Sequence, residues 1–153
     1  MPLVSDTTSV ERVIAAPASA IFALLADPSR HRDIDGSGTV REALEGPTRL
    51  EQGDTFGMSM RAGFGYTMVN EVVELEPDRR IAWQARPVQV SLQGLIGGRI
   101  WRYELEPVDG GTRVRETWDI SQERFKAKVW PLRGLTRLSM RRTLDRIEKL
   151  VAA

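Results

Sequence analysis

The chain has 153 residues, 41% hydrophobic and 28% charged, with a net charge of +1, so we expect one globular domain over residues 1–153. It contains no cysteine, which excludes a disulfide framework, a thiol nucleophile and a thiolate metal site. The opening residues MPLVSDTTSV show no secretory signal, and no apolar run approaches the ~18 residues that span a bilayer, so we expect a soluble cytoplasmic protein.

The N-terminal part combines strand and helix signals. Thr7–Ile14 is predicted as a strand, Pro17 suits the first turn of a helix, and Ala18–Ala26 continue that helix. The signals that follow are a short helical turn at Ser29–Asp33, a loop at Asp35–Gly38 and a strand at Val40–Leu44.

The middle of the chain is predicted to form antiparallel strands. Phe56, Met58 and Met60 alternate with small or polar residues, which is typical of a half-buried strand at 54–61. The other predicted strands are Tyr66–Leu75, Arg80–Ala85, Arg99–Glu106 and Thr112–Ile120, the last two joined by the hairpin signal Asp109-Gly110-Gly111. The absence of a strand–helix–strand rhythm favours an α+β layout with a curved antiparallel sheet.

A long helix is predicted from about Leu132 to the C-terminus. Its apolar side forms one stripe at ~100° per residue, consisting of Leu132, Leu135, Ser139, Met140, Thr143, Leu144, Ile147, Leu150 and Val151. A helix of this length with one apolar face needs a large surface to lie against. The concave side of the sheet would supply that surface.

The two-residue period of the strands predicts which side chains face this helix. The predicted cavity wall consists of Phe56, Met58, Met60, Trp83, Trp101, Tyr103, Val114, Glu116, Trp118, Leu135 and Ser139. A well-filled core would explain most of these residue types. The polar-tipped aromatic side chains, the methionines and the inward carboxylate of Glu116 instead favour a cavity for an apolar or amphipathic small molecule.

Three side chains are candidates for catalysis in such a cavity. An inward Glu116 in apolar surroundings would have a raised pKa and would suit a general acid or base. Alternatively, Glu116 pairs with an inward arginine or tyrosine, for which Arg146 at the edge of the helix stripe is one candidate. Tyr103 and His31 complete the set of candidates.

The segment His31–Gly38 partly matches a metal-binding motif. Asp33, Asp35 and Ser37 match the first half of a calcium loop, but the twelfth position is Leu44 and not glutamate. With one histidine in the chain, a zinc or iron site would need further oxygen ligands. We therefore predict a capped turn, no metal and no cofactor; the alternative is a functional lip at the cavity mouth.

Basic residues are concentrated at the C-terminal end. Residues 121–153 carry 9 Lys and Arg against 3 Asp and Glu, whereas residues 1–120 carry 13 against 18. This basic segment contains Arg124, Lys126, Lys128, Arg133, Arg137, Arg141 and Arg142, interleaved with Phe125 and Trp130. An ordinary solvated face and a weak contact with anionic membranes both fit this pattern. We expect no nucleic-acid partner, because the rest of the chain is acidic and no groove-reading motif is present.

The segments APASAIFALLADP, VELEPDRRIAW and IWRYELEPVDGGTRVRETWD resemble the SRPBCC or START-like superfamily, and more narrowly the polyketide cyclase/dehydrase-like proteins. The resemblance implies a helix-grip fold, in which a curved antiparallel sheet of about seven strands wraps around a long C-terminal helix and encloses a cavity. The resemblance implies no particular set of catalytic residues. At His31–Gly38 the chain differs from the family, because many relatives have a Trp-rich stretch there.

Two functions follow as hypotheses. The first is a carrier or sensor, a monomer or homodimer, that holds a lipid, isoprenoid or polyketide-like ligand. The alternative is a polyketide cyclase/dehydratase-like enzyme, in which cavity shape and one or two polar residues act on a folded chain. A protein-interaction module that uses the basic helix is a weaker third hypothesis.

Overall fold

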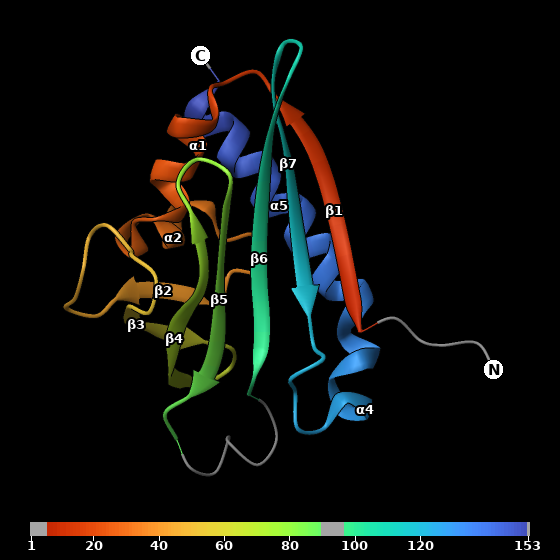
Figure 1. Ribbon diagram of the computed structural model, residues 1–153. Helices are drawn as coiled ribbons and strands as arrows, with labels where there is room; N and C mark the ends of the chain where they lie inside the picture. Colours follow the sequence, from red (N-terminus) through yellow and green to blue (C-terminus); the bar gives the residue numbers. More distant parts are fainter. Residues whose placement is uncertain (1–5, 90–96, 153) are drawn as a thin grey trace.

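A seven-stranded antiparallel sheet curves around one long helix in the computed structural model, which describes residues 6–89 and 97–152 (Figure 1). The strands are β1 Thr7–Ile14, β2 Val40–Ala43, β3 Thr55–Arg61, β4 Gly65–Glu76, β5 Arg80–Pro87, β6 Arg99–Val108 and β7 Gly111–Asp119. Their order in the sheet is β1-β7-β6-β5-β4-β3-β2, so the first strand lies beside the last. This is the helix-grip α+β fold, and the predicted strands are confirmed.

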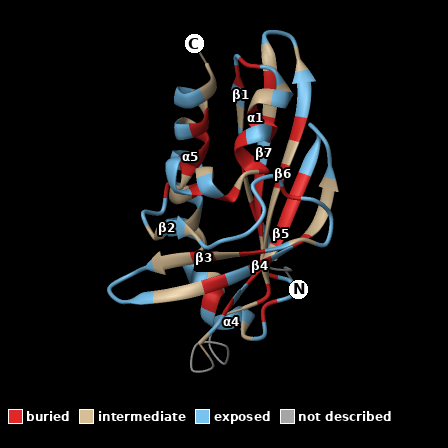
Figure 2. Cartoon of the chain, turned by 90° about the vertical axis from the view of Figure 1, so that its left-hand side faces the viewer, coloured by how far each residue is buried: buried red, intermediate tan, exposed pale blue. Residues whose placement is uncertain are grey.

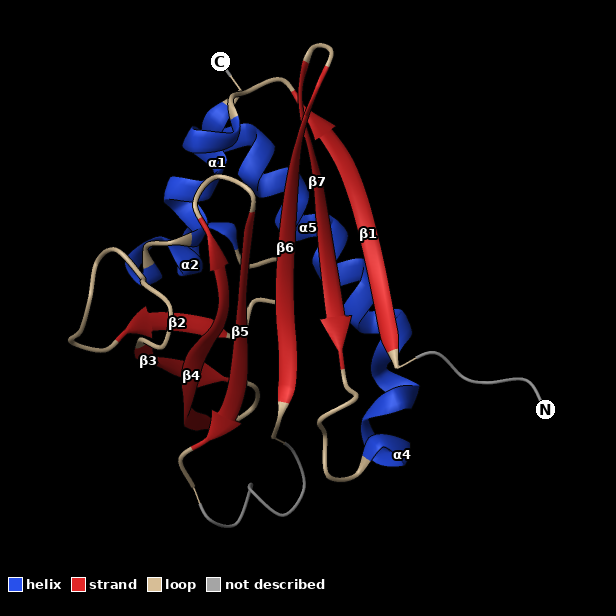
Figure 3. Ribbon diagram, in the orientation of Figure 1, coloured by secondary structure: helices blue, strands red, loops and turns tan. Residues whose placement is uncertain are grey.

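The helices gather on one side of the sheet (Figure 3). They are α1 Ala18–Leu25, η1 Pro28–Arg30, α2 His31–Ile34, α4 Lys126–Val129, η2 Trp130–Leu132 and α5 Arg133–Val151. The predicted long helix is confirmed, and the short helices α4 and η2 that lead into it were not predicted. No helix in the two described ranges combines the length and the hydropathy needed to cross a bilayer.

The packed core lies between the sheet, α1 and the second half of α5 (Figure 2). Ile14, Phe22, Leu144 and Ile147 are almost completely buried there. Because α5 packs directly against β1 and β7, the inner face of β7 is largely covered by the helix. Burial of such large apolar side chains is the main source of folding free energy.

The predicted apolar stripe of α5 is only half buried. Met140, Thr143, Leu144 and Ile147 are buried, but Leu135 is 70% exposed. Leu132 and Leu150, also on the predicted stripe, and Leu138 beside it are exposed as well. The first turns of α5 face a hollow on the concave side of the sheet, so this part of the stripe points inward as predicted but is not packed against other side chains.

Candidate functional site

A cavity of about 340 Å³ lies between the inner face of the sheet and the first half of α5. Nine of the eleven side chains predicted for the cavity wall line it: Phe56, Met58, Met60, Trp83, Trp101, Tyr103, Glu116, Leu135 and Ser139. Val114 and Trp118 do not line this cavity, because both side chains are buried in the packed core. Of β7, only Glu116 reaches the cavity among the described residues.

Aromatic rings form a rigid group on the cavity wall. The His31 imidazole stacks on Trp83 with ring centres 4.7 Å apart, and Phe56 meets His31 edge-on at 5.4 Å. Trp83 also contacts Tyr103, with ring centres 5.6 Å apart. Ring contacts therefore run from His31 through Trp83 to Tyr103, and they fix the position of the tyrosine hydroxyl.

Glu116 and Tyr103 form a buried polar pair at the cavity wall. They are directly opposite each other on β7 and β6, and Glu116 is only 2% exposed. Burial raises the pKa of Glu116 to about 8, although a hydrogen bond donated by the Tyr103 hydroxyl lowers it. At neutral pH most Glu116 carboxyl groups are thus protonated. The predicted alternative partner Arg146 is exposed on α5, and the side chain that bonds to Glu116 is Tyr103.

One oxygen of this carboxyl group is unpaired. Glu116 Oε1 is buried and has no hydrogen-bond partner among the described residues. The indole Nε1 of Trp118, two residues along the same face of β7, is also buried without a partner. A buried polar atom without a partner costs about 1–3 kcal/mol, so a ligand group that reached Oε1 would recover that free energy.

His31 is neutral in this environment. Burial lowers its pKa, and the hydrogen bond to the Leu25 carbonyl oxygen, 2.8 Å from Nε2, opposes that effect only partly. Because a carbonyl oxygen accepts, Nε2 carries the proton and Nδ1 is left as an acceptor. His31 lines the cavity, but the Trp83 ring lies against it on the side of Tyr103 and Glu116.

The loop after α2 is a capped turn, as predicted. Asp35 Oδ1 accepts hydrogen bonds from the Ser37 amide at 3.0 Å and the Ser37 hydroxyl at 2.7 Å, and Oδ2 accepts from the Val40 amide at 3.1 Å. Asp33 instead pairs with Arg30 at 2.8 Å. The Asp35 carboxylate therefore bonds within the turn, and the Asp33 carboxylate bonds to Arg30. The described residues contain no group of three His, Asp or Glu side chains that could hold a metal.

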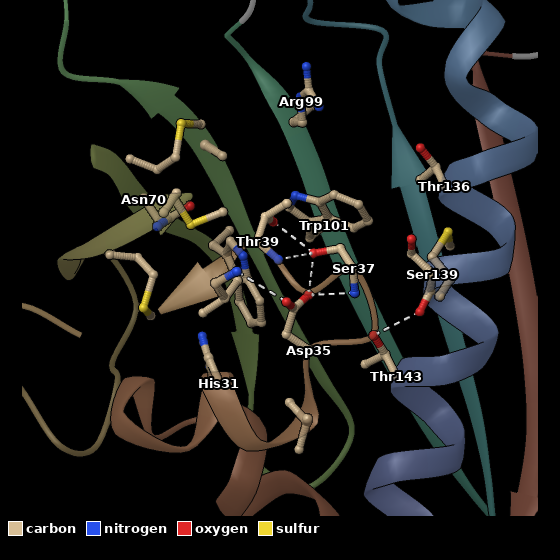
Figure 4. A pocket seen from close by; sticks show the side chains of 18 of the residues that line it. His31, Asp35, Ser37, Thr39, Asn70, Arg99, Trp101, Thr136, Ser139 and Thr143 are labelled. Carbon is tan, nitrogen blue, oxygen red and sulfur yellow. Dashed lines mark hydrogen bonds between the residues drawn. The ribbon is translucent and has the colours of Figure 1, made fainter. Parts of the chain in front are cut away.

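This loop is seated directly on α5. The Gly36 amide donates a hydrogen bond to Thr143 Oγ1 at 2.9 Å. Thr143 Oγ1 in turn donates to the Ser139 carbonyl oxygen at 3.1 Å (Figure 4). A Cβ atom on Gly36 would collide with the Ser139 carbonyl, so only glycine permits this approach. The loop and the helix together form one rim of the cavity.

Several polar side chains of the cavity wall were not predicted from the sequence. Arg99 lies at the far end of the cavity from His31 and Asp35 (Figure 4). The others are Thr39, Tyr66, Asn70, Thr136 and Thr143. Arg99 could have been found, because the alternation that points Trp101 and Tyr103 inward also points Arg99 inward. Thr143 is on the predicted inward stripe of α5, but its contact with Gly36 could not be predicted because that loop is 107 residues away.

Residues 5–152 match the family described as polyketide cyclase / dehydrase and lipid transport. Among curated proteins, the uncharacterized protein Rv0088 of Mycobacterium tuberculosis is 39% identical over 108 residues, which cover 69% of this chain and 44% of that protein. The uncharacterized protein MT0096, from another strain, is 38% identical over the same shares of the two chains. The match thus spans less than half the length of these relatives.

Solved structures share the fold. Protein CV1439 from Chromobacterium violaceum has a TM-score of 0.76 at 18% identity, with 97% of this chain and 98% of that chain covered. Protein Ms6760 from Mycobacterium smegmatis has a TM-score of 0.71 at 18% identity, with 95% and 90% covered. At these identities the similarity shows the fold alone.

Proposed function

The chain belongs to the polyketide cyclase/dehydrase and lipid transport family, and we propose that it binds a hydrophobic or amphipathic small molecule in its cavity. The observation that carries this proposal is the cavity of about 340 Å³ with a mainly apolar wall. Small-molecule sites are typically concave and apolar, with volumes of roughly 300–1,000 Å³ and a few fixed polar groups. A lipid, an isoprenoid or a polyketide-like molecule fits this chemistry, held by a carrier or sensor.

Methionines give the wall an adaptable side. Met58 and Met68 are paired directly across β3 and β4, and Met60 lies opposite Tyr66 in the same ladder. All three line the cavity. Unbranched thioether side chains adjust to irregular shapes, which suits a ligand with a flexible or variable apolar body.

Glu116 supplies the fixed polar group. As a mostly protonated carboxyl it donates a hydrogen bond to a carbonyl, ether or hydroxyl oxygen without the repulsion that a carboxylate would exert. Its free Oε1 accepts from a hydroxyl. The expected ligand is therefore apolar with at least one oxygen function that reaches the wall of β7.

Native mass spectrometry of the purified protein tests this proposal. We expect a non-covalent mass adduct that disappears on delipidation, and uptake of the neutral probe Nile red by the delipidated protein. A protein that carries no adduct and leaves Nile red fluorescence unchanged would contradict the proposed function.

A cyclase/dehydratase-like enzyme is the second candidate. It is favoured by one specific observation, the buried Glu116 carboxyl group that bonds to the Tyr103 hydroxyl while its Oε1 has no partner among the described residues. A carboxyl group with a pKa near 8 exchanges protons readily at neutral pH, as a general acid or base must. The cavity would hold a reactive chain in a folded shape while Glu116 moves the proton.

The surface beside the cavity mouth suits transient loading from a membrane. Leu132 and Leu135 are exposed and also line the cavity, and Leu138 is exposed on the next turn. The same helix carries the exposed cations Arg137 and Arg141. Exposed apolar side chains among basic ones favour weak contact with an anionic lipid surface.

A further inference from the structure

Arg99 occupies one end of the cavity. It is on the inward face of β6, two residues before Trp101 and four before Tyr103. At a rise of about 3.3 Å per residue, this spacing separates Arg99 from the Tyr103–Glu116 pair by about 13 Å along the strand. The two ends of the cavity wall therefore differ in chemistry, with a guanidinium group at one and a carboxyl group at the other.

A buried carboxylate holds this guanidinium in place. Glu123, whose side chain is 0% exposed, accepts hydrogen bonds from Arg99 Nε at 3.0 Å and from the Arg99 amide at 2.9 Å. The Gly97 amide donates to the same carboxylate at 3.1 Å. The negative charge of Glu123 is thus shared among three donors, and the Arg99 guanidinium is held through one edge only.

The backbone before β6 is built for this clamp. Gly97 and Gly98 have φ angles of 138° and 104°, which are strained for residues with a side chain. A Cβ atom on Gly98 would also collide with the Gln122 carbonyl oxygen. These two glycines let the chain turn tightly enough for the Gly97 amide, the Arg99 amide and Arg99 Nε to converge on Glu123.

The two Nη amino groups of Arg99 remain available. In residues 6–89 and 97–152 they have no hydrogen-bond or ion-pair partner. The Arg99 side chain is 17% exposed, and it is the only lysine or arginine among the described residues of the cavity wall. Burial raises the pKa of the Tyr66 hydroxyl, and the positive charge of Arg99 partly opposes this effect.

We propose that Arg99 binds the oxyanion head group, a carboxylate or a phosphate, of an amphipathic ligand whose apolar body lies along Trp101 and the methionines. This inference rests on the proposed function and narrows its ligand class. The Nη1–Nη2 edge of a guanidinium matches two oxygens of such a group in a bidentate contact. Glu116 lies at the other end and is mostly uncharged at neutral pH, so it does not repel the anion.

Binding of decanoate, decyl phosphate and decanol by Nile red displacement at pH 7 tests this inference. The variant is Arg99→Met/Glu123→Gln, because the loss of Arg99 alone would leave the Glu123 charge buried and unpaired. This variant loses a charge-assisted hydrogen bond to the anion, so we expect its affinity for decanoate and decyl phosphate to fall about tenfold. Its affinity for decanol should be unchanged. The anion whose affinity falls more identifies the head group as a carboxylate or a phosphate.

The same strand offers a matched control. Arg102 is on the outer face of β6 and pairs with Glu74 at 2.7 Å, so Arg102→Met/Glu74→Gln removes an equivalent ion pair away from the cavity. All three affinities should be unchanged in this control. If the first double variant does not fold, Arg99→Lys keeps the charge paired with Glu123 and still removes the bidentate edge, so anion affinity should again fall.

Two results separate the inference from the function on which it rests. Unchanged anion affinity in the folded Arg99 variant, or an equal loss for decanol, would overturn the role of Arg99 alone. Nile red uptake by the native protein without displacement by either anion would also overturn the role of Arg99 alone, whereas a native protein that takes up neither Nile red nor any of the three compounds would overturn both.

Discussion

The two ends of the concave sheet face differ although they share strands and a helix. At one end, α1 and the second half of α5 bury Ile14, Phe22 and Leu144 in a dense core. At the other, the first half of α5 lies over a cavity of about 340 Å³ walled by methionines and polar-tipped aromatic side chains. One end contributes stability through close packing, and the other gives up that packing for an open cavity, which the proposed function assigns to a ligand.

The largest expected effect comes from paired leucine substitutions on α5. Leu144 is 1% exposed at the filled end and Leu135 is 70% exposed at the open end, so the same change tests both ends with equal helix propensity. Leu144→Ala should lower the free energy of unfolding by about 2–5 kcal/mol, and Leu135→Ala by less than about 1 kcal/mol. Urea unfolding measures both, and equal losses would contradict the division into two ends.

Glu116 should make stability depend on pH. Its pKa is about 8 in the folded protein and near 4.5 in the unfolded chain, so the native state binds the proton more tightly. This stabilising contribution is fully present below pH 4.5 and is lost as pH rises through about 8. Between these values the free energy of unfolding should fall by roughly 1 kcal/mol per pH unit, as measured by urea unfolding at several pH values.

Glu116→Gln should remove that slope, because the amide does not titrate. Glu71→Gln, at an exposed position of β4, should preserve it. If Glu116 is also a catalytic acid or base, turnover of the true substrate should fall by roughly 10²–10⁴ in the same variant while binding changes little. A variant that loses stability but keeps full turnover would assign Glu116 a structural role and exclude it as the catalytic acid or base.

At the open end, Trp101→Ala should weaken Nile red binding. Trp101 lines the cavity, and the loss of a buried aromatic contact corresponds to about a tenfold increase in Kd. Trp130 is outside the cavity, under the Arg133 guanidinium 3.4 Å from its ring centre, so Trp130→Ala is the matched control. Equal effects of the two substitutions would mean that the probe does not enter the cavity.

The smallest expected effect concerns vesicles. We expect weak binding to anionic vesicles that is lost by a few hundred millimolar salt, because exposed charges are screened within about 8 Å at physiological ionic strength. Arg137→Glu/Arg141→Glu should abolish it without a change in Nile red affinity. Equal binding to neutral and anionic vesicles would leave these arginines as an ordinary solvated face.

The strand faces could be predicted because alternation is a local property. Trp83, Trp101, Tyr103 and Glu116 follow from the two-residue period alone, and all four line the cavity. The same period placed Trp118 beside them, but whether an inward side chain faces the cavity or the packed core depends on which elements cover that part of the sheet. That arrangement is set by contacts between distant parts of the chain.

The polar features of the site depend even more on distant contacts. The two-residue period of β6 points Arg99 inward. The position of its guanidinium group, however, is fixed by Glu123, 24 residues later, and by the turn at Gly97 and Gly98. The contact of Gly36 with Thr143 spans 107 residues. No local pattern in the sequence connects such partners, so this part of the site became visible only in the structure.

The position of β1 beside β7 has a consequence for how the chain folds. Ser9 and Thr117 join the two strands through a hydroxyl contact of 2.8 Å across 108 residues, and Arg12 reaches Glu148 of α5 at 3.0 Å. Of the seven described strands, the one that is synthesised first therefore pairs with the one that is synthesised last. Such non-local pairing slows folding, because the entropy of closing a long loop is lost before the contacts form. Until β7 emerges, the hydrogen-bonding edge of β1 is open to other chains.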